Sequence, residues 1–274
     1  TKYASMTDDE RIKYINTTMD TYLKDGTLKQ AVADGYVLVE RTTESGVRLG
    51  IVGLIDLDDY DFDLKKKTLI RATEGTVISR IPPRVKIREN AAIELPHVML
   101  LVDDPIDRQN IDGCQGATQE DAVNIAAVKH GIIEYVYAIR DTLRKLYDTE
   151  LMQGGGHIRG YAIEGEAAKQ VTEAFAAKQN SCGGFLFAVG DGNHSLATAK
   201  TCWENIKKSG KFTEEQLKNH PARHALVEIC NLHSEALGFK PIHRLLKNVD
   251  VKDMLSFFEL KSQNKDLRAL RAMR

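Results

Sequence analysis

The 274-residue sequence lacks any run of about 18 apolar residues, so no transmembrane helix is predicted. It has only four cysteines, Cys114, Cys182, Cys202 and Cys230, which form no CxxC pair and fit no common zinc spacing. We interpret them as reduced, mostly structural thiols and expect a cytoplasmic protein. The sequence also contains no GxxxxGK[ST] loop, no GxSxG elbow and no Rossmann glycine fingerprint. These motifs usually identify P-loop NTPases, esterases and dehydrogenases.

Neither sign of charge dominates the chain. The 38 Lys and Arg residues and the 39 Asp and Glu residues give a net charge of -1, which provides no global attraction to nucleic acid or to an anionic membrane. We predict that the acidic run over residues 56–63 and the basic run over 65–67 form a solvated loop rather than a metal site. The chain begins at Thr1 without a methionine or a signal-peptide core, and we interpret this as a start within a longer protein.

Hydrophobic periodicity predicts both helices and strands. Helical spacing covers residues 7–33, 132–146, 164–178 and 193–208, and strand-like patterns cover 36–41, 47–57, 97–103, 157–163, 185–189 and 225–232. We therefore predict a mixed α+β or α/β fold. The expected organisation is an N-terminal α+β region over 1–105, a loop or linker over 106–130, a C-terminal α/β region over 131–260 and a basic tail over 261–274. One compact domain overall is the alternative.

The most informative stretch is the apolar run Phe185–Val189 followed by Gly190–Ser195. This order predicts a strand, a tight turn and a helix N-terminus, where free N–H groups and the helix dipole suit a phosphate. Gly192 permits close approach of a ligand, and Asp191 can accept a hydroxyl proton or hold Mg²⁺. The alternative is an ordinary strand-to-helix turn in which Asp191 or Asn193 caps the helix.

Two further segments are candidates for chemistry. The triple glycine 154–156 before His157 indicates either close backbone approach to a ligand or a helix C-cap with a flexible link. Around Glu74, several arginines can neutralise a phosphate; the alternative is a surface helix with scattered ion pairs. These arginines are Arg71, Arg80, Arg84 and Arg88.

Six motifs then occur in a recognisable order. They are Thr68–Thr76, Ile81–Arg84, Met152–His157, Gly190–Ser195, His220–Arg223 and Pro241–Arg244. Together they resemble the bacterial and archaeal domain-of-unknown-function family 1015, often described as similar to the ParB and sulfiredoxin group. The resemblance covers about residues 7–260. It implies a ParB/sulfiredoxin-like core with a mixed sheet and flanking helices, elaborated by an N-terminal hairpin region.

The resemblance also implies a function. Related ParB, sulfiredoxin and free-serine-kinase proteins hold nucleotide phosphates with their matching turn and helix start, so residues 192–195 become the phosphate cradle. Members commonly carry Asp-Gly-His-His-Arg where this chain has Asp191–Ser195. Their His-Glu-x-Thr segment aligns with Thr73–Thr76, which keeps Glu74 and lacks the His. Full-length members begin with a further segment that is absent from this sequence.

We therefore predict a nucleotide-dependent phosphotransferase acting on a small hydroxylated metabolite such as serine, with ATP or ADP and Mg²⁺. The predicted catalytic residues are Glu74, Asp191 and His194, and no protein metal-ligand set is predicted. The predicted phosphate and nucleotide contacts are Gly192, Asn193, Ser195, Arg71, Arg84, Gly155, Gly156 and His157.

The expected partners are the nucleotide and the small substrate, without nucleic acid or membrane, and a homodimer stays open. Two other functions also stay open. One is a ParB-like nucleotide-binding or nucleic-acid-associated module without turnover, which needs a basic face and usually a helix-turn-helix. The other is a sensor that binds nucleotide and releases it unchanged.

Overall fold

The computed structural model describes residues 5–106, 125, 128, 130–238, 247–254 and 256. The chain divides into two compact units, residues 1–237 and 238–274. In the second unit, residues 251–254 are helical. Several predicted features lie outside the described residues: most of the 106–130 linker with Cys114, the Pro241–Arg244 motif and the basic tail at 261–274.

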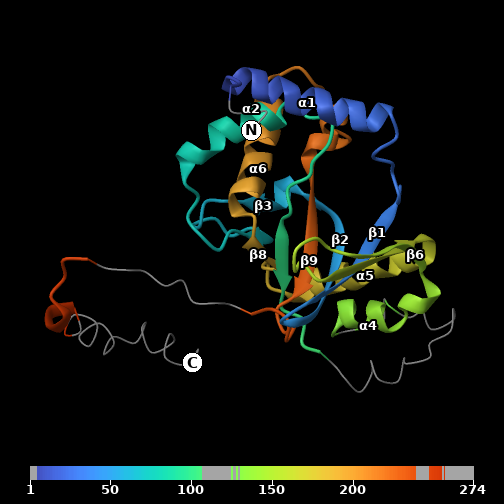
Figure 1. Ribbon diagram of the computed structural model, residues 1–274. Helices are drawn as coiled ribbons and strands as arrows, with labels where there is room; N and C mark the ends of the chain where they lie inside the picture. Colours follow the sequence, from blue (N-terminus) through green and yellow to red (C-terminus); the bar gives the residue numbers. More distant parts are fainter. Residues whose placement is uncertain are drawn as a thin grey trace. The chain divides into compact units, whose positions relative to one another are not determined.

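In the described part of the first unit, nine strands form one mixed sheet (Figure 1). They are β1 (Gly35–Thr43), β2 (Gly46–Asp56), β3 (Tyr60–Asp61), β4 (Ile70–Arg71), β5 (Met99–Val102), β6 (Arg144–Glu150), β7 (His157–Glu164), β8 (Phe187–Asp191) and β9 (His224–Asn231). The spatial order is β3-β4-β8-β5-β9-β2-β1-β7-β6. The pairs β3–β4, β4–β8 and β5–β9 are parallel and the other pairs are antiparallel. Both predicted regions, 1–105 and 131–260, contribute strands to this sheet.

The helices flank the sheet, and Figure 1 shows α1 and α2 at one end of the strands and α4 at the other. They are α1 (Asp8–Lys24), α2 (Ile81–Arg88), α4 (Ile132–Ala138), α5 (Gly165–Ser181), α6 (Asn193–Lys208) and α7 (Glu214–Lys218), with the 3₁₀ turns η1 (Leu57–Asp59), η2 (Ile78–Arg80), η4 (Arg140–Thr142) and η5 (Pro221–Arg223). The α1 helix begins at a Thr7–Glu10 capping box and ends well before the predicted residue 33, because Gly26 adopts a left-handed φ of 77°.

The mixed α+β prediction is confirmed, and so is the β1–β2 hairpin. The predicted helix over 132–146 is wrong in its second half. The α4 helix ends at Ala138, and Arg144–Glu150 forms β6, paired with β7 at the edge of the sheet. An edge strand with mostly exposed residues has no alternating apolar pattern to reveal it.

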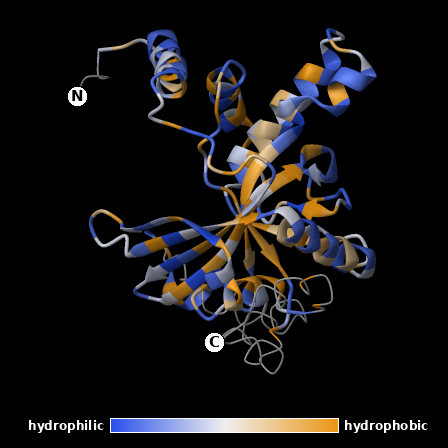
Figure 2. Ribbon diagram, turned by 90° about the vertical axis from the view of Figure 1, so that its right-hand side faces the viewer, coloured by the Kyte–Doolittle hydropathy of each residue, from blue (hydrophilic) through white to orange (hydrophobic). Residues whose placement is uncertain are grey.

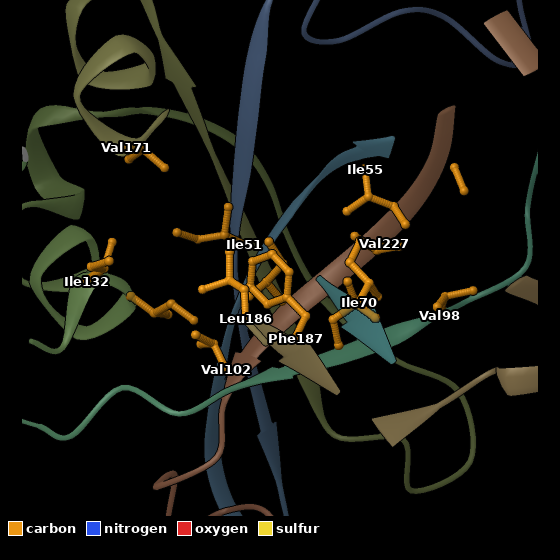
Figure 3. Close-up of a cluster of buried hydrophobic side chains, with 14 of the residues drawn as sticks. Ile51, Ile55, Ile70, Val98, Val102, Ile132, Val171, Leu186, Phe187 and Val227 are labelled. Carbon is orange, nitrogen blue, oxygen red and sulfur yellow. The ribbon is translucent and has the colours of Figure 1, made fainter. Parts of the chain in front are cut away.

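The hydrophobic core lies on one face of the sheet. Side chains from β2, β4, β5, β8 and β9 meet side chains from α4 and α5 there (Figure 3). Hydrophobic residues concentrate on the central strands, whereas the helices present hydrophilic residues outward (Figure 2). The α6 helix adds Leu196, Ala199 and Trp203 to the same cluster. Burial of a large apolar side chain such as Leu196 contributes about 1.5–3 kcal/mol, so these contacts hold α6 against the sheet.

Most charged residues of the runs predicted as a solvated loop are exposed, but some of the acidic residues are paired. Asp56 forms an ion pair with Arg223 at 2.6 Å, and Asp58 accepts hydrogen bonds from Lys207 and Trp203. These contacts join η1 to α6 and η5. Within the described ranges, no helix has the length and apolar character needed to cross a bilayer.

Candidate functional site

The predicted strand–turn–helix is present at Gly192. The β8 strand ends at Asp191, and α6 begins at Asn193. Gly192 has a left-handed φ of 85°, and a Cβ added there would lie 2.9 Å from the His97 carbonyl oxygen. Among the described residues no side chain caps α6, so the alternative in which Asp191 or Asn193 caps the helix is wrong. The first N–H groups of a helix have no intrahelical partner, which leaves those of α6 available to an anion.

The Asn193 side chain holds a distant loop against the start of α6. Its Oδ1 accepts the Thr73 N–H at 3.2 Å, and its Nδ2 donates to Thr73 Oγ1 at 3.3 Å. Thr73 Oγ1 in turn donates to the Val189 carbonyl at 2.6 Å. Asn193 is only 4% exposed, so its side-chain amide forms its hydrogen bonds inside the protein. Residues 120 positions apart in the sequence are thereby brought together.

His194 and Glu74, two predicted catalytic residues, are neighbours. His194 Nε2 accepts the Val77 N–H at 3.1 Å, so this nitrogen carries no proton. The proton therefore sits on Nδ1, which lies 3.6 Å from Glu74 Oε1. In the same loop, Thr76 Oγ1 is buried without a hydrogen-bond partner among the described residues. The Glu74 carboxylate therefore lies beside the His194 side chain in the first turn of α6.

A pocket of about 420 Å³ opens between α2 and α6 beside the turn. Arg84 and Ser195 both line it, with Thr198 deeper along α6 and apolar side chains such as Ile87 and Leu95. Arg88 also lines it; burial lowers the pKa of this guanidinium to about 10, and Glu94 forms an ion pair with it. Arg84 has no ion-pair partner in the described part of the chain, so its charge is available to a ligand.

Arg71 does not join this group. Its guanidinium donates to the carbonyl oxygens of Thr68 and Gly184 and lies 4.4 Å from the Phe185 ring centroid. Thr68 precedes the first residue of β4, and Gly184 and Phe185 precede the first residue of β8. Gly192, by contrast, follows the last residue of β8.

The triple glycine lies elsewhere in the sheet. It connects β6 to β7, and β5, β9, β2 and β1 lie between β7 and β8. Gly156 accepts the Leu151 N–H at 2.7 Å, and His157 pairs with Asp148 at 2.9 Å. Gly156 is left-handed at φ 77°, and an added Cβ would overlap the Thr42 carbonyl oxygen. The close backbone approach predicted for these glycines is therefore to β1, and the alternative of a helix C-cap is wrong.

Three polar residues next to the turn were not among the predicted site residues. Glu228 on β9 has a side chain only 6% exposed, and His97 Nε2 lies 2.5 Å from its carboxylate. Arg48 Nη2 donates to both Glu228 oxygens at 3.2–3.3 Å. Met99 pairs with Asp191 on one side and with Glu228 on the other, so Glu228 lies level with the end of β8, with β5 between them. A glutamate inside the apolar run 225–232 was the available signal, because a buried charge requires a partner.

The Glu228 cluster makes stability depend on pH. Burial raises the pKa of Glu228, but the hydrogen bond with His97 and the charge of Arg48 outweigh it, so the pKa lies below its ordinary value of 4.5. A depressed carboxyl pKa stabilises the fold above the unfolded-state pKa, and this contribution is lost as pH falls through the folded value. We expect the free energy of unfolding to fall between pH 5 and pH 3, and to fall less steeply in Glu228→Gln.

Urea titrations at a series of pH values in that window measure this effect. The matched control is Glu44→Gln, an exposed carboxylate in the β1–β2 turn. Equal pH slopes for the wild type and Glu228→Gln would contradict the assignment.

The described residues contain no group of three or more His, Cys, Asp or Glu side chains that could hold a metal ion by themselves.

Comparison with known proteins defines the family. A family model described as protein of unknown function (DUF1015) matches residues 1–267, so the chain belongs to this family. No curated protein and no solved structure matches it.

Proposed function

We propose that this protein is a nucleotide-dependent phosphotransferase that acts on the hydroxyl group of a small metabolite such as serine, as the suggested kinship with ParB, sulfiredoxin and free serine kinases implies. The observation that carries the proposal is the uncapped start of α6, which has the Glu74 loop on one side and the Arg84–Ser195 pocket beside it. Phosphoryl transfer depends mainly on positioning and charge neutralisation. The helix start, Arg84 and the loop offer both.

Each polar group of this site has a proposed role in binding or catalysis. The N–H groups at the start of α6 bind phosphate oxygens, with the Ser195 hydroxyl and the Arg84 guanidinium alongside. Asp191 and Glu74 supply carboxylates that accept a proton or hold a cation, and the His194 imidazole lies beside Glu74, with Nδ1 3.6 Å from Oε1. Two carboxylates suit Mg²⁺, which enters such sites with the phosphates and takes one or two protein carboxylates. A bound Mg²⁺ would neutralise phosphate charge there.

The pocket has the size of a small-molecule site. Its volume of about 420 Å³ falls within the roughly 300–1,000 Å³ of typical ligand pockets. The lining combines apolar side chains with a few polar groups, the composition that binds a base or a small organic substrate while fixing its orientation.

Calorimetry and a turnover assay on the purified protein test the proposal. ATP or ADP, each with Mg²⁺, is titrated first, and serine is then added while ³¹P NMR follows the phosphorylated product. Absence of both binding and turnover rejects the proposal. Tight binding without product favours a sensor, and salt-sensitive DNA retention in a gel-shift assay favours the nucleic-acid-associated module.

Arg84→Ala is expected to weaken nucleotide binding by about 10- to 100-fold, because a charge-assisted contact is worth roughly 1.5–3 kcal/mol. Calorimetry measures the change in Kd. Arg80→Ala is the matched control, since Arg80 is also exposed, lies one helical turn earlier and is not part of the pocket lining. Equal losses in the two variants would show that Arg84 contributes only general positive charge.

A further inference from the structure

We infer that His97 is the general base of this site and that Glu228 and Arg48 are its positioning residues. The inference rests on the proposed function and deepens it, because it assigns the proton transfer to one named atom, His97 Nδ1. His97 directly precedes Val98 and β5, and its backbone carbonyl packs against Gly192. This contact places the His97 backbone at the end of β5 that adjoins the phosphate-binding turn.

The hydrogen bond to Glu228 fixes the tautomer of His97. Glu228 is buried and ionised at neutral pH, because its pKa lies below the ordinary range through the hydrogen bond with His97 and the charge of Arg48, which outweigh its burial. An ionised carboxylate only accepts hydrogen bonds, so His97 Nε2, at 2.5 Å, must carry the proton. Nδ1 then has a free lone pair, and the side chain is 52% exposed. This nitrogen can accept a proton from a substrate.

The positions of Glu228 and Arg48 are set by the backbone. The Glu228 carboxylate passes over Gly50 on β2, where an added Cβ would lie 2.5 Å from Oε1. Arg48, two residues earlier on β2, donates to both carboxylate oxygens. Glu228 therefore holds a fixed negative charge against the imidazole. A buried carboxylate in this position orients the imidazole and stabilises the imidazolium that forms when a proton arrives.

The neighbouring acid–base groups are less suited to the task. His194 already uses Nε2 as an acceptor for the Val77 N–H, and its Nδ1 carries the proton. Assigning the proton to His97 leaves the Asp191 and Glu74 carboxylates for the cation.

The O–H bond of the acceptor hydroxyl breaks and its proton forms a bond to His97 Nδ1, giving an imidazolium opposite the Glu228 carboxylate. The hydroxyl oxygen forms a bond to the terminal phosphorus of the nucleotide. The bond from that phosphorus to the bridging oxygen breaks, and its electron pair leaves with the shortened nucleotide. The imidazolium finally releases its proton to water.

The test measures kcat, KM and nucleotide Kd for the wild type, His97→Ala, His97→Gln and Glu228→Gln, with ATP, Mg²⁺ and the hydroxyl substrate. We expect kcat to fall by about 100-fold in both His97 variants, with nucleotide Kd unchanged, and by about 10-fold in Glu228→Gln. Added imidazole should restore part of the activity of His97→Ala and none of that of Glu228→Gln. His233→Ala is the matched control, because His233 is half exposed and pairs with Asp103 at 2.7 Å in the same way.

The outcomes separate the two proposals. A wild type without turnover rejects the proposed function, and the role of His97 falls with it. An active wild type with fully active His97 variants, or with no rescue by imidazole, rejects the His97 assignment alone.

Nitrogen-15 NMR of the His97 ring measures its tautomer without any need for turnover, and we expect the Nε2–H tautomer at neutral pH. The Nδ1–H tautomer would overturn the assignment. Two His97 variants guard against one that fails to fold, which circular dichroism detects.

Discussion

Asp191→Asn is expected to lower kcat for phosphoryl transfer by about 10³-fold, because it removes a carboxylate that balances a cation at the reacting phosphate. Asp191 Oδ1 accepts the Gly192 N–H at 2.7 Å, and an asparagine Oδ1 can accept the same hydrogen bond. The substitution therefore deletes the charge and preserves the turn. Steady-state kinetics at saturating nucleotide, with Mg²⁺ varied, measure the loss and should show that more Mg²⁺ is required.

The control for this experiment is Asp63→Asn. Asp63 is also exposed, and its Oδ1 accepts a backbone N–H, that of Lys65, at 3.0 Å. It lies in the segment between β3 and β4, outside the residues proposed for the site. We expect kcat for Asp63→Asn to equal that of the wild type. If Asp191→Asn were equally active, the carboxylate would have no part in the reaction and the site would lie elsewhere.

The sequence predicted the Gly192 turn because all of its parts are local. An apolar run, a glycine with a left-handed φ and an amphipathic helix follow one another within about 20 residues, and short-range sterics determine each of them. The roles of Asn193 and His194 are different. Their side chains were predicted to face the ligand, yet both point inward to the loop that carries Glu74. Which way a side chain turns depends on a partner 120 residues away.

Sequence patterns were least informative where the order of the strands in the sheet determines which residues are neighbours. Arg71 is close to Glu74 in sequence, but its guanidinium turns toward Gly184 at the start of β8. The triple glycine resembled a ligand-binding loop, and the glycine there instead lets two strands approach each other. The His97–Glu228 pair was missed for the converse reason. The two residues are 131 positions apart and become neighbours only because β9 pairs with β5.

Trp203→Ala is expected to produce the largest loss of stability, about 3–5 kcal/mol in the free energy of unfolding, because it leaves a cavity and removes the indole hydrogen bond to Asp58. Trp203 is 1% exposed, and its indole Nε1 donates to Asp58 Oδ1 at 2.9 Å. Lys200, one turn earlier, donates to the Leu57 carbonyl at 2.9 Å. These contacts attach the middle of α6 to η1. Urea unfolding followed by far-ultraviolet circular dichroism measures the loss.

Two further variants identify which contact matters. Trp203→Phe keeps most of the apolar area and loses only the indole donor, so we expect a loss of about 1–2 kcal/mol. Tyr22→Ala, an aromatic residue 42% exposed on α1, should change stability by less than about 0.5 kcal/mol. Trp203 lies ten residues beyond the start of α6, about 15 Å along the helix. At temperatures where Trp203→Ala stays folded, its nucleotide affinity should therefore equal that of the wild type. A parallel loss of affinity would mean that the turn depends on the packing of the whole helix, rather than on the local contacts of Gly192, Asn193 and His194.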